Sequence, residues 1–204
     1  MMEMSAYGIE LEKRNYIFHP QKFALWLFIL TVIMIFGGLT SAYIVQQSFV
    51  SEEKRIFFDL PEILWVNLGI ILFSSVTMQY AMWVARQNER TKALVALGMT
   101  LILGIMFLIG QVNAWGAMTA SGMPMVDSSR FDNSVSFFYV FTGLHGAHIV
   151  GGLIVLSIVF IRTALQNYRR PGQRALTYEL TGIFWHFLGL LWVYLFIFLK
   201  ITQN

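Results

Sequence analysis

Two histidines, three residues apart, lie in the uncharged stretch "FTGLHGAHIVGG" (residues 141–152). Imidazole nitrogens ligate haem iron and other metals, and they also donate and accept hydrogen bonds. Residues three apart in a helix share a face, so His145 and His148 could act together. A third histidine, His186, lies in the next uncharged stretch. These residue types leave two kinds of chemistry open: ligation of haem or a metal, and hydrogen bonding between helices.

Other groups that could take part in metal or proton chemistry are scarce. Glu179 is the one acid near the histidines, and the three earlier apolar stretches contain polar but no charged side chains, among them Asn67 and Gln111. A di-iron helical bundle needs several inward carboxylates, and ion or proton transporters usually need a buried acid or broken helices. Cysteine is absent, which excludes thiolate metal sites, disulfides and attached c-type haem. The sequence therefore argues against these classes.

One remaining alternative is a haem held by His148 and His186, as in a small haem-b membrane anchor or electron carrier. His148 lies about 12 residues, roughly 18 Å, from one end of its predicted helix. His186 lies about 14 residues, roughly 21 Å, from the same end of the bundle on the next helix. Their similar depth would permit a bridge between them.

The other alternative is structural, and the glycines around the histidines favour it. They are Gly143, Gly146, Gly151 and Gly152. Such residues leave one helix face nearly without side chains, so that helices approach closely in lipid and polar side chains bond across the gap. We therefore expect these glycines to pack against a neighbouring helix, and the histidines to form interhelical hydrogen bonds.

The elements that position these residues are predicted to be membrane-spanning helices. The 204 residues are 57% hydrophobic and 12% charged, whereas soluble domains carry about 25% charged residues. A spanning helix needs about 20 mostly apolar residues. The predicted helices cover about residues 23–45, 63–85, 93–115, 136–161 and 180–199. The sequence thus predicts an all-α integral membrane protein, a five-transmembrane-helix bundle that forms a single membrane domain over residues 1–204.

The connections between these helices are predicted to be short. The uncharged run from 93 to 126 is too long for one span, so we expect a helix that ends near Trp115 and a loop at 116–126. Residues 168–174 ("YRRPGQR") contain Pro171-Gly172, which predicts a turn. The net charge of +3 is small and scattered, so nucleic acid is not an expected partner.

Basic residues in the loops predict the orientation, because they accumulate on the cytoplasmic side. Ten of the 14 basic residues share the side of the N-terminus. These are Lys13, Arg14, Lys22, Arg86, Arg90, Lys92, Arg162, Arg169, Arg170 and Arg174. The opposite side has Lys54, Arg55, Arg130 and Lys200. We therefore expect a cytoplasmic N-terminus and a C-terminus outside, in the periplasm.

Four motifs carry a resemblance to a known family. "FTGLHGAHIVGG" and "GIFWHFLGLLWVYLF" (182–196) resemble the last two helices of subunit III of haem–copper oxidases, with its H-G-x-H and W-H-F-x-x-x-x-W motifs. "LPEILWVNLGIILFSSVTMQYA" (60–81) is similar to its P-x-x-x-W-x-N helix, and "FLIGQVNAW" (107–115) to the helix that carries its glutamine. The similarity covers roughly residues 18–200, in order.

The resemblance implies an accessory subunit of a cytochrome c oxidase that binds no haem or copper itself. Haem and copper would lie in subunits I and II, the expected partners. A fourth subunit and a larger respiratory supercomplex are further possible partners. Subunit III packs on subunit I, holds phospholipid, and supports proton uptake and sustained oxygen reduction. A quinol oxidase subunit III is the alternative, because subunit II decides the electron donor.

Some residue roles follow from the resemblance. Arg162 matches an arginine that contacts a lipid phosphate, and Glu179 matches the acid seven residues before the histidine of W-H-F. His145, His148 and His186 become interhelical polar residues, as do Asn67 and Gln111. The shorter, five-helix form is typical of bacteria, which implies a multi-pass protein of the bacterial cytoplasmic membrane.

Three positions depart from the family pattern. Where the family often carries acids, this chain has Val32 in its first helix, Ala114 soon after Gln111, and Gly189 after the W-H-F motif. These departures argue against a proton-collecting role through buried carboxylates and leave the lipid-holding role intact.

Overall fold

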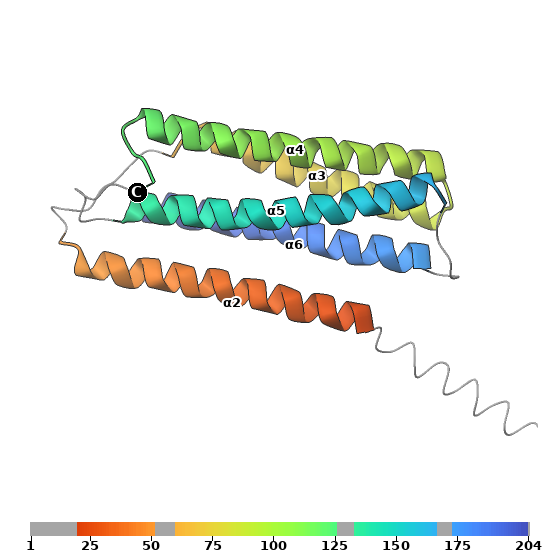
Figure 1. Cartoon of the computed structure of the whole chain (residues 1–204), viewed down its shortest axis with the longest axis horizontal. Helices are drawn as coiled ribbons and strands as arrows, with labels where there is room; N and C mark the ends of the chain where they lie inside the picture. The colour runs from red at the N-terminus through yellow and green to blue at the C-terminus, as the bar shows by residue number, and fades with distance from the viewer. Residues whose placement is uncertain (1–19, 52–59, 126–132, 167–172, 204) are drawn as a thin grey trace, which may run out of the picture. The chain divides into compact units, whose positions relative to one another are not determined.

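Five long helices make up most of the described chain. The computed structural model describes residues 20–51, 60–125, 133–166 and 173–203. Its helices are α2 (Pro20–Phe49), α3 (Ile63–Arg86), α4 (Arg90–Ala120), α5 (Ser134–Ala164) and α6 (Gln173–Thr202) (Figure 1). Each is long and apolar enough to cross a membrane. The predicted all-α membrane fold with five helices is confirmed.

The helix ends differ from the predicted ones, most clearly in α4. We expected this helix to end near Trp115, but it continues to Ala120. Residues 116–120 contain no proline. The first residue after them with a left-handed backbone is Gly122, with φ at 75°. Glycine commonly ends helices in this way. The prediction of a loop beginning at residue 116 was therefore wrong.

The last helix also begins earlier than its apolar core. α6 starts at Gln173 rather than near residue 180. Gln173 and Arg174, which we assigned to the predicted turn, therefore belong to the first turn of this helix. Polar side chains are compatible with a helix that extends beyond the hydrocarbon. The remainder of that predicted turn lies outside the described residues.

The chain divides into two compact units, residues 1–37 and 38–204. In the first unit the structure describes residues 20–37, which form the beginning of α2. The second unit contains the end of α2 and all of α3, α4, α5 and α6. The expectation of a single membrane domain stays a prediction.

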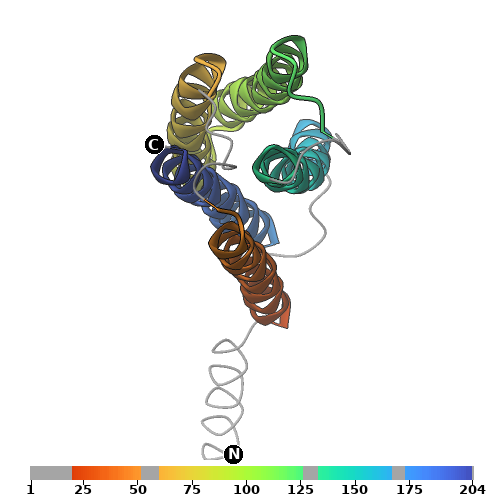
Figure 2. The same cartoon turned by 90° about the vertical axis from the view of Figure 1, so that its left-hand side faces the viewer.

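Four helices of the second unit form a ring in which each contacts two others. α3 packs against α4 and α6, and α5 packs against the same two helices (Figure 2). A tight turn joins α3 to α4, with Asn88 in the left-handed region at φ 60°. Asparagine is one of the few residues other than glycine that tolerate this conformation. All the candidate residues on α3 to α6 are therefore presented by one four-helix assembly.

The interior of this assembly is filled by large aromatic side chains. Phe107, Trp185 and Trp192 are at most 1% exposed. In contrast, Ile102 and Ile109 on α4 are more than half exposed, as expected for side chains that face lipid. Because lipid is as apolar as the protein interior, close packing and hydrogen bonds hold such helices together.

Candidate functional site

His145 is buried inside the four-helix assembly, among aromatic rings. Its side chain is 0% exposed. The imidazole stacks on Trp192 of α6, with ring centroids 5.1 Å apart and an interplanar angle of 29°. It meets Phe107 of α4 edge to face, at 5.7 Å. Neither ring nitrogen has a hydrogen-bond partner among the described residues. His145 is thus fixed by ring packing with α4 and α6.

His148 makes a hydrogen-bond contact within its own helix. It is half-buried on α5, and its Nδ1 lies 2.7 Å from the carbonyl oxygen of Leu144. Since a carbonyl can only accept, Nδ1 must carry the proton in this bond. An interhelical bond of His148 stays a prediction.

His186 contacts a different helix. Its Nε2 lies 3.2 Å from Oε1 of Gln79, which joins α6 to α3. The contacts of His148 and His186 thus differ: one bonds the backbone of α5 and the other a side chain of α3. If a haem iron were ligated by both histidines, and by His186 through Nε2, the contact of His186 with Gln79 would have to break. Among the described residues, no group of three or more histidine, aspartate and glutamate side chains could hold a metal ion.

Further hydrogen bonds join the helices at positions that sequence reasoning missed. Indole nitrogens donate to hydroxyl oxygens in two pairs, Trp185 to Ser74 at 3.1 Å and Trp115 to Thr142 at 2.9 Å. Hydroxyls pair with one another in Thr77–Thr100 at 2.8 Å and in Thr163–Tyr178 at 2.9 Å. Serine and threonine within apolar helices were the available signal, because such residues commonly bond across membrane helices.

Arg90 is another residue whose role the sequence did not suggest. From the start of α4, its Nε donates to the carbonyl oxygen of Thr163 at 3.2 Å, and Nη2 donates to the carbonyl of Ala164. Both carbonyls belong to the last turn of α5, where helices lack backbone partners. Arg90 thereby caps α5 and joins the two helices.

The four predicted packing glycines lie in different surroundings. At Gly152, an added Cβ would come within 3.0 Å of Leu188 and 3.2 Å of Trp185. At Gly143 and Gly146, the nearest side-chain atoms would be at 3.7 and 4.0 Å, which is ordinary contact. At Gly151, nothing described lies within 4 Å. On α5, the closest helix approach is therefore at Gly152.

Close approaches that were not predicted involve glycines of α4 and α6. A Cβ on Gly104 would meet Leu153 at 2.7 Å and Trp185 at 2.8 Å. A Cβ on Gly110 would collide with the Asn67 amide, and one on Gly182 with the Met82 thioether. These glycines were not recognised because isolated glycines are frequent in membrane helices.

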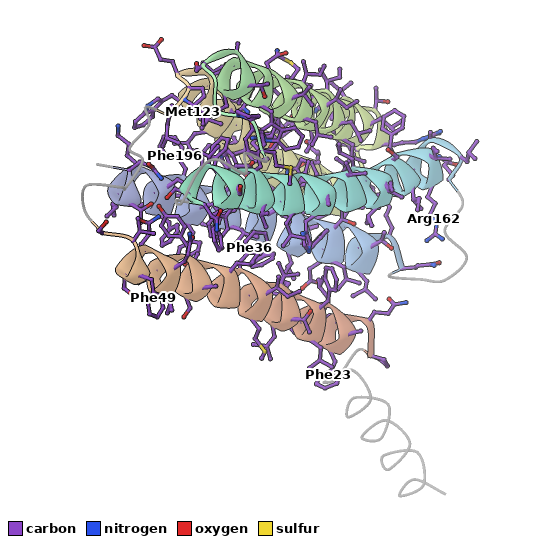
Figure 3. All side chains as sticks on the ribbon, turned by 60° about the vertical axis from the view of Figure 1, so that its left-hand side comes forward. Phe23, Phe36, Phe49, Met123, Arg162 and Phe196 are labelled. Carbon is purple, nitrogen blue, oxygen red and sulfur yellow. The ribbon has the colours of Figure 1, made fainter. Side chains whose placement is uncertain are left out.

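The other candidate residues occupy the interior and one end of the assembly. Asn67 and Gln111 are both 1% exposed. Glu179 is half-buried and lines a small cavity between α3 and α6 with Met82, Arg86 and Tyr178. Arg162 is exposed near the end of α5, and its side chain reaches away from the ribbon (Figure 3). The structure thus does not bring Arg162 into the cavity that Glu179 lines.

Two of the positions where the resemblance implies an acid are buried on α4 and α6. Ala114 is 0% exposed. A Cβ on Gly189 would lie 3.0 Å from Oγ of Ser75 and 3.9 Å from Ile71, both on α3. The space that an aspartate side chain would need at position 189 is therefore taken by α3.

Comparison with known proteins identifies relatives along nearly the whole chain. The family model for "Cytochrome c oxidase subunit III" matches residues 12–203. The chain is 28% identical over 200 residues to a protein of Rickettsia bellii named "Probable cytochrome c oxidase subunit 3", an alignment that covers 90% of this chain and 69% of that protein. For the corresponding protein of Rickettsia felis the share covered is 66%, so the chain spans about two-thirds of the length of these relatives.

Other relatives carry the name of a different oxidase. The chain is 27% identical over 176 residues to "Cytochrome bo(3) ubiquinol oxidase subunit 3" of Pseudomonas aeruginosa, covering 85% of this chain and 81% of that protein. It is 22% identical over 196 residues to "Probable quinol oxidase subunit 3" of Staphylococcus saprophyticus, covering 95% and 94%. The relatives thus share the subunit type and differ in the electron donor that their names give.

Proposed function

Since the chain belongs to the cytochrome c oxidase subunit III family, we propose that it is the accessory subunit III of a respiratory haem–copper oxidase that takes electrons from cytochrome c. It is a multi-pass membrane protein and a subunit of an oxidase complex. The match over residues 12–203 is the observation that carries this proposal. Subunits I and II are its proposed partners, and they would hold the haem and copper.

The packing of the four-helix assembly supports a role without a cofactor of its own. Trp185 bonds Ser74, and His186 bonds Gln79, so polar groups that could serve chemistry instead join helices. His145 is enclosed by aromatic rings. The chain would therefore act as a firmly packed scaffold that stabilises subunit I, and we retain His145, His148, His186, Asn67 and Gln111 as structural residues.

The proposed position in the membrane follows from the basic residues. Arg86, Arg90 and Arg162 lie near one end of α3, α4 and α5, and basic residues prefer the cytoplasmic side. We propose a cytoplasmic N-terminus, a C-terminus in the periplasm and a bacterial cytoplasmic membrane. The relatives named above are bacterial proteins.

Phospholipid is the proposed ligand, and Arg162 is its proposed contact. The side chain is exposed at the end of α5 (Figure 3), where a long basic side chain can reach the head groups. A guanidinium can bind a phosphate through two parallel hydrogen bonds. Bound lipid at this place would support proton uptake by subunit I and sustained oxygen reduction.

A quinol oxidase is the second candidate, favoured by the names of the Pseudomonas and Staphylococcus relatives. The purified complex should be tested with reduced cytochrome c and with a quinol, under the same conditions. Oxygen consumption with cytochrome c is expected. Consumption with quinol alone would replace the first assignment with the second.

An absorption spectrum of the chain purified alone tests the proposed absence of haem. We expect no stoichiometric b-type spectrum. A haem spectrum that His148→Ala or His186→Ala removes would instead identify a haem anchor. His145→Ala is the matched control, because His145 was not one of the two proposed haem ligands and should leave such a spectrum in place.

A further inference from the structure

Each helix of the four-helix assembly contributes a fully buried polar side chain that has no hydrogen-bond partner among the described residues. These are Asn67 of α3, Gln111 of α4, His145 of α5 and Trp192 of α6, and we name them the polar layer. None is more than 1% exposed. No side chain of another subunit can reach them without displacing one of the four helices.

Contacts between neighbouring helices place the members of the polar layer at one level. The Asn67 amide lies so close to Gly110, the residue before Gln111, that a Cβ added there would collide with it. His145 stacks on Trp192. Phe107 contacts both of these rings, with centroids 5.7 and 5.0 Å away.

The position of Gln111 follows from the pairing of α4 with α5. Trp115 bonds Thr142 one helical turn to one side of Gln111. Phe107 meets His145 one turn to the other side. Residues four apart share a helix face, so Gln111 lies between these two contacts and faces the same interior.

Seven polar atoms of this layer have no hydrogen-bond partner among the described residues. They are Oδ1 and Nδ2 of Asn67, Oε1 and Nε2 of Gln111, both ring nitrogens of His145, and Nε1 of Trp192. Most buried polar atoms in proteins are hydrogen-bonded, and leaving one without a partner costs free energy. Seven such atoms in one region therefore point to a further hydrogen-bonding group.

Direct pairing among the four side chains does not complete the bonding. Packing fixes the Asn67 amide against Gly110 and the His145 ring between Trp192 and Phe107. Gln111 has the longest of the flexible side chains, but one carboxamide offers at most two donors and two acceptors. It cannot serve all five other atoms, so a group beyond these four side chains is needed to complete the bonding.

We propose that the polar layer is an internal water site, in which one or more ordered water molecules bridge Asn67, Gln111, His145 and Trp192. Water donates and accepts, so it can join the indole N–H, both amides and either tautomer of the histidine. Buried water typically takes two to four polar partners, which this layer supplies. The site would tie all four helices together, and it does not depend on the oxidase role.

This site can be tested with a cryo-EM map of the membrane complex that contains the full chain. The resolution of the map must be high enough to show ordered water. The wild type should show solvent density within hydrogen-bonding distance of at least two members of the polar layer. Gln111→Met keeps the side-chain length and removes both polar atoms, so it should lose or rearrange that density. Gln79→Met is the matched control, because Gln79 is exposed on α3 and its loss should leave the density unchanged.

Other outcomes would overturn the proposal. A wild-type layer without solvent density, or one in which the four side chains pair directly, would show that no water is held. Density that persists unaltered in Gln111→Met would show that the water does not belong to this layer. If that variant does not assemble, the wild-type map alone decides between a hydrated and a dry layer.

Discussion

Nε2 of His186 lies 3.2 Å from Oε1 of Gln79 and joins α6 to α3. This histidine belongs to the W-H-F motif, and its described partner is an uncharged amide. Such a pair holds two helices in register. We therefore expect the pair to contribute to the stability of the chain.

A double-mutant cycle on His186 and Gln79 should give a small, favourable coupling. Interhelical hydrogen bonds in a membrane protein average about 0.6 kcal/mol and reach about 1.7 kcal/mol. His186→Phe and Gln79→Leu, singly and together, can be compared by unfolding the purified chain in detergent. Additive effects of the two changes would show that the pair contributes nothing.

Two adjacent glycines of α5 should differ sharply in their tolerance of a larger side chain. Gly152→Leu forces bulk against Leu188 and Trp185, where a Cβ alone would already lie at 3.0 and 3.2 Å. Overpacking of this kind typically costs about 1–3 kcal/mol. Thermal unfolding of the purified chain should show this loss.

Gly151→Leu is the matched control, since nothing described lies within 4 Å of an added Cβ there. It should leave the stability of the isolated chain close to that of the wild type. Equal losses in the two variants would mean that the approach of α5 to α6 at Gly152 is not tight.

Arg90 should stabilise the junction of α4 with α5. Its guanidinium donates to the carbonyls of Thr163 and Ala164, and a cation at a helix C-terminus contributes about 0.3–1 kcal/mol at the surface. Arg90→Met should lower the unfolding temperature of the chain and increase hydrogen exchange at the end of α5.

Lys92→Met is the control for Arg90. Lys92 lies two residues further along α4 and pairs with Glu89 at 2.6 Å, within the same exposed turn. Its removal should leave exchange at the end of α5 unchanged. Faster exchange in both variants would point to a general effect of lost charge.

Arg162→Ala should leave the complex assembled with a normal haem spectrum, but with less tightly bound phospholipid and a shorter active life. Anionic head groups attract a basic residue by about 1 kcal/mol. Arg162→Lys separates a phosphate-binding role from a role as an interface anchor. A bidentate phosphate contact weakens when lysine replaces arginine, whereas an interface anchor keeps its function.

Native mass spectrometry of lipid adducts and oxygen consumption over many turnovers provide the measurements for Arg162. Lys200→Ala, at the far end of α6, is the control and should change neither. Unchanged lipid retention and unchanged endurance in Arg162→Ala would show that this arginine only anchors the helix.

The helices could be predicted from the sequence because a spanning segment must be long and apolar. The residues at which the helices end were harder to predict. Helix α4 continues past Trp115 and ends before Gly122, where the backbone is left-handed. An apolar segment reveals where lipid is crossed, but a helix continues until something in the backbone stops it.

The neighbours of the candidate residues could not be predicted in the same way. A membrane helix is apolar on every side, so hydrophobic periodicity does not identify the face that packs inward. For this reason the sequence indicated His145 but not its stacking on Trp192. It also indicated four glycines of α5 without separating Gly152 from Gly151.

The most direct test of the central claim is purification of the affinity-tagged chain from its native membranes in mild detergent. We predict that haem-containing subunit I and subunit II co-purify in equal amounts with the chain, and that the preparation reduces oxygen. Deletion of the gene for this chain should leave subunits I and II with normal haem spectra and a normal initial rate of oxygen reduction. That activity should then decline sooner than in the wild type. A tagged chain that purifies without haem-containing partners and without oxidase activity would contradict the claim.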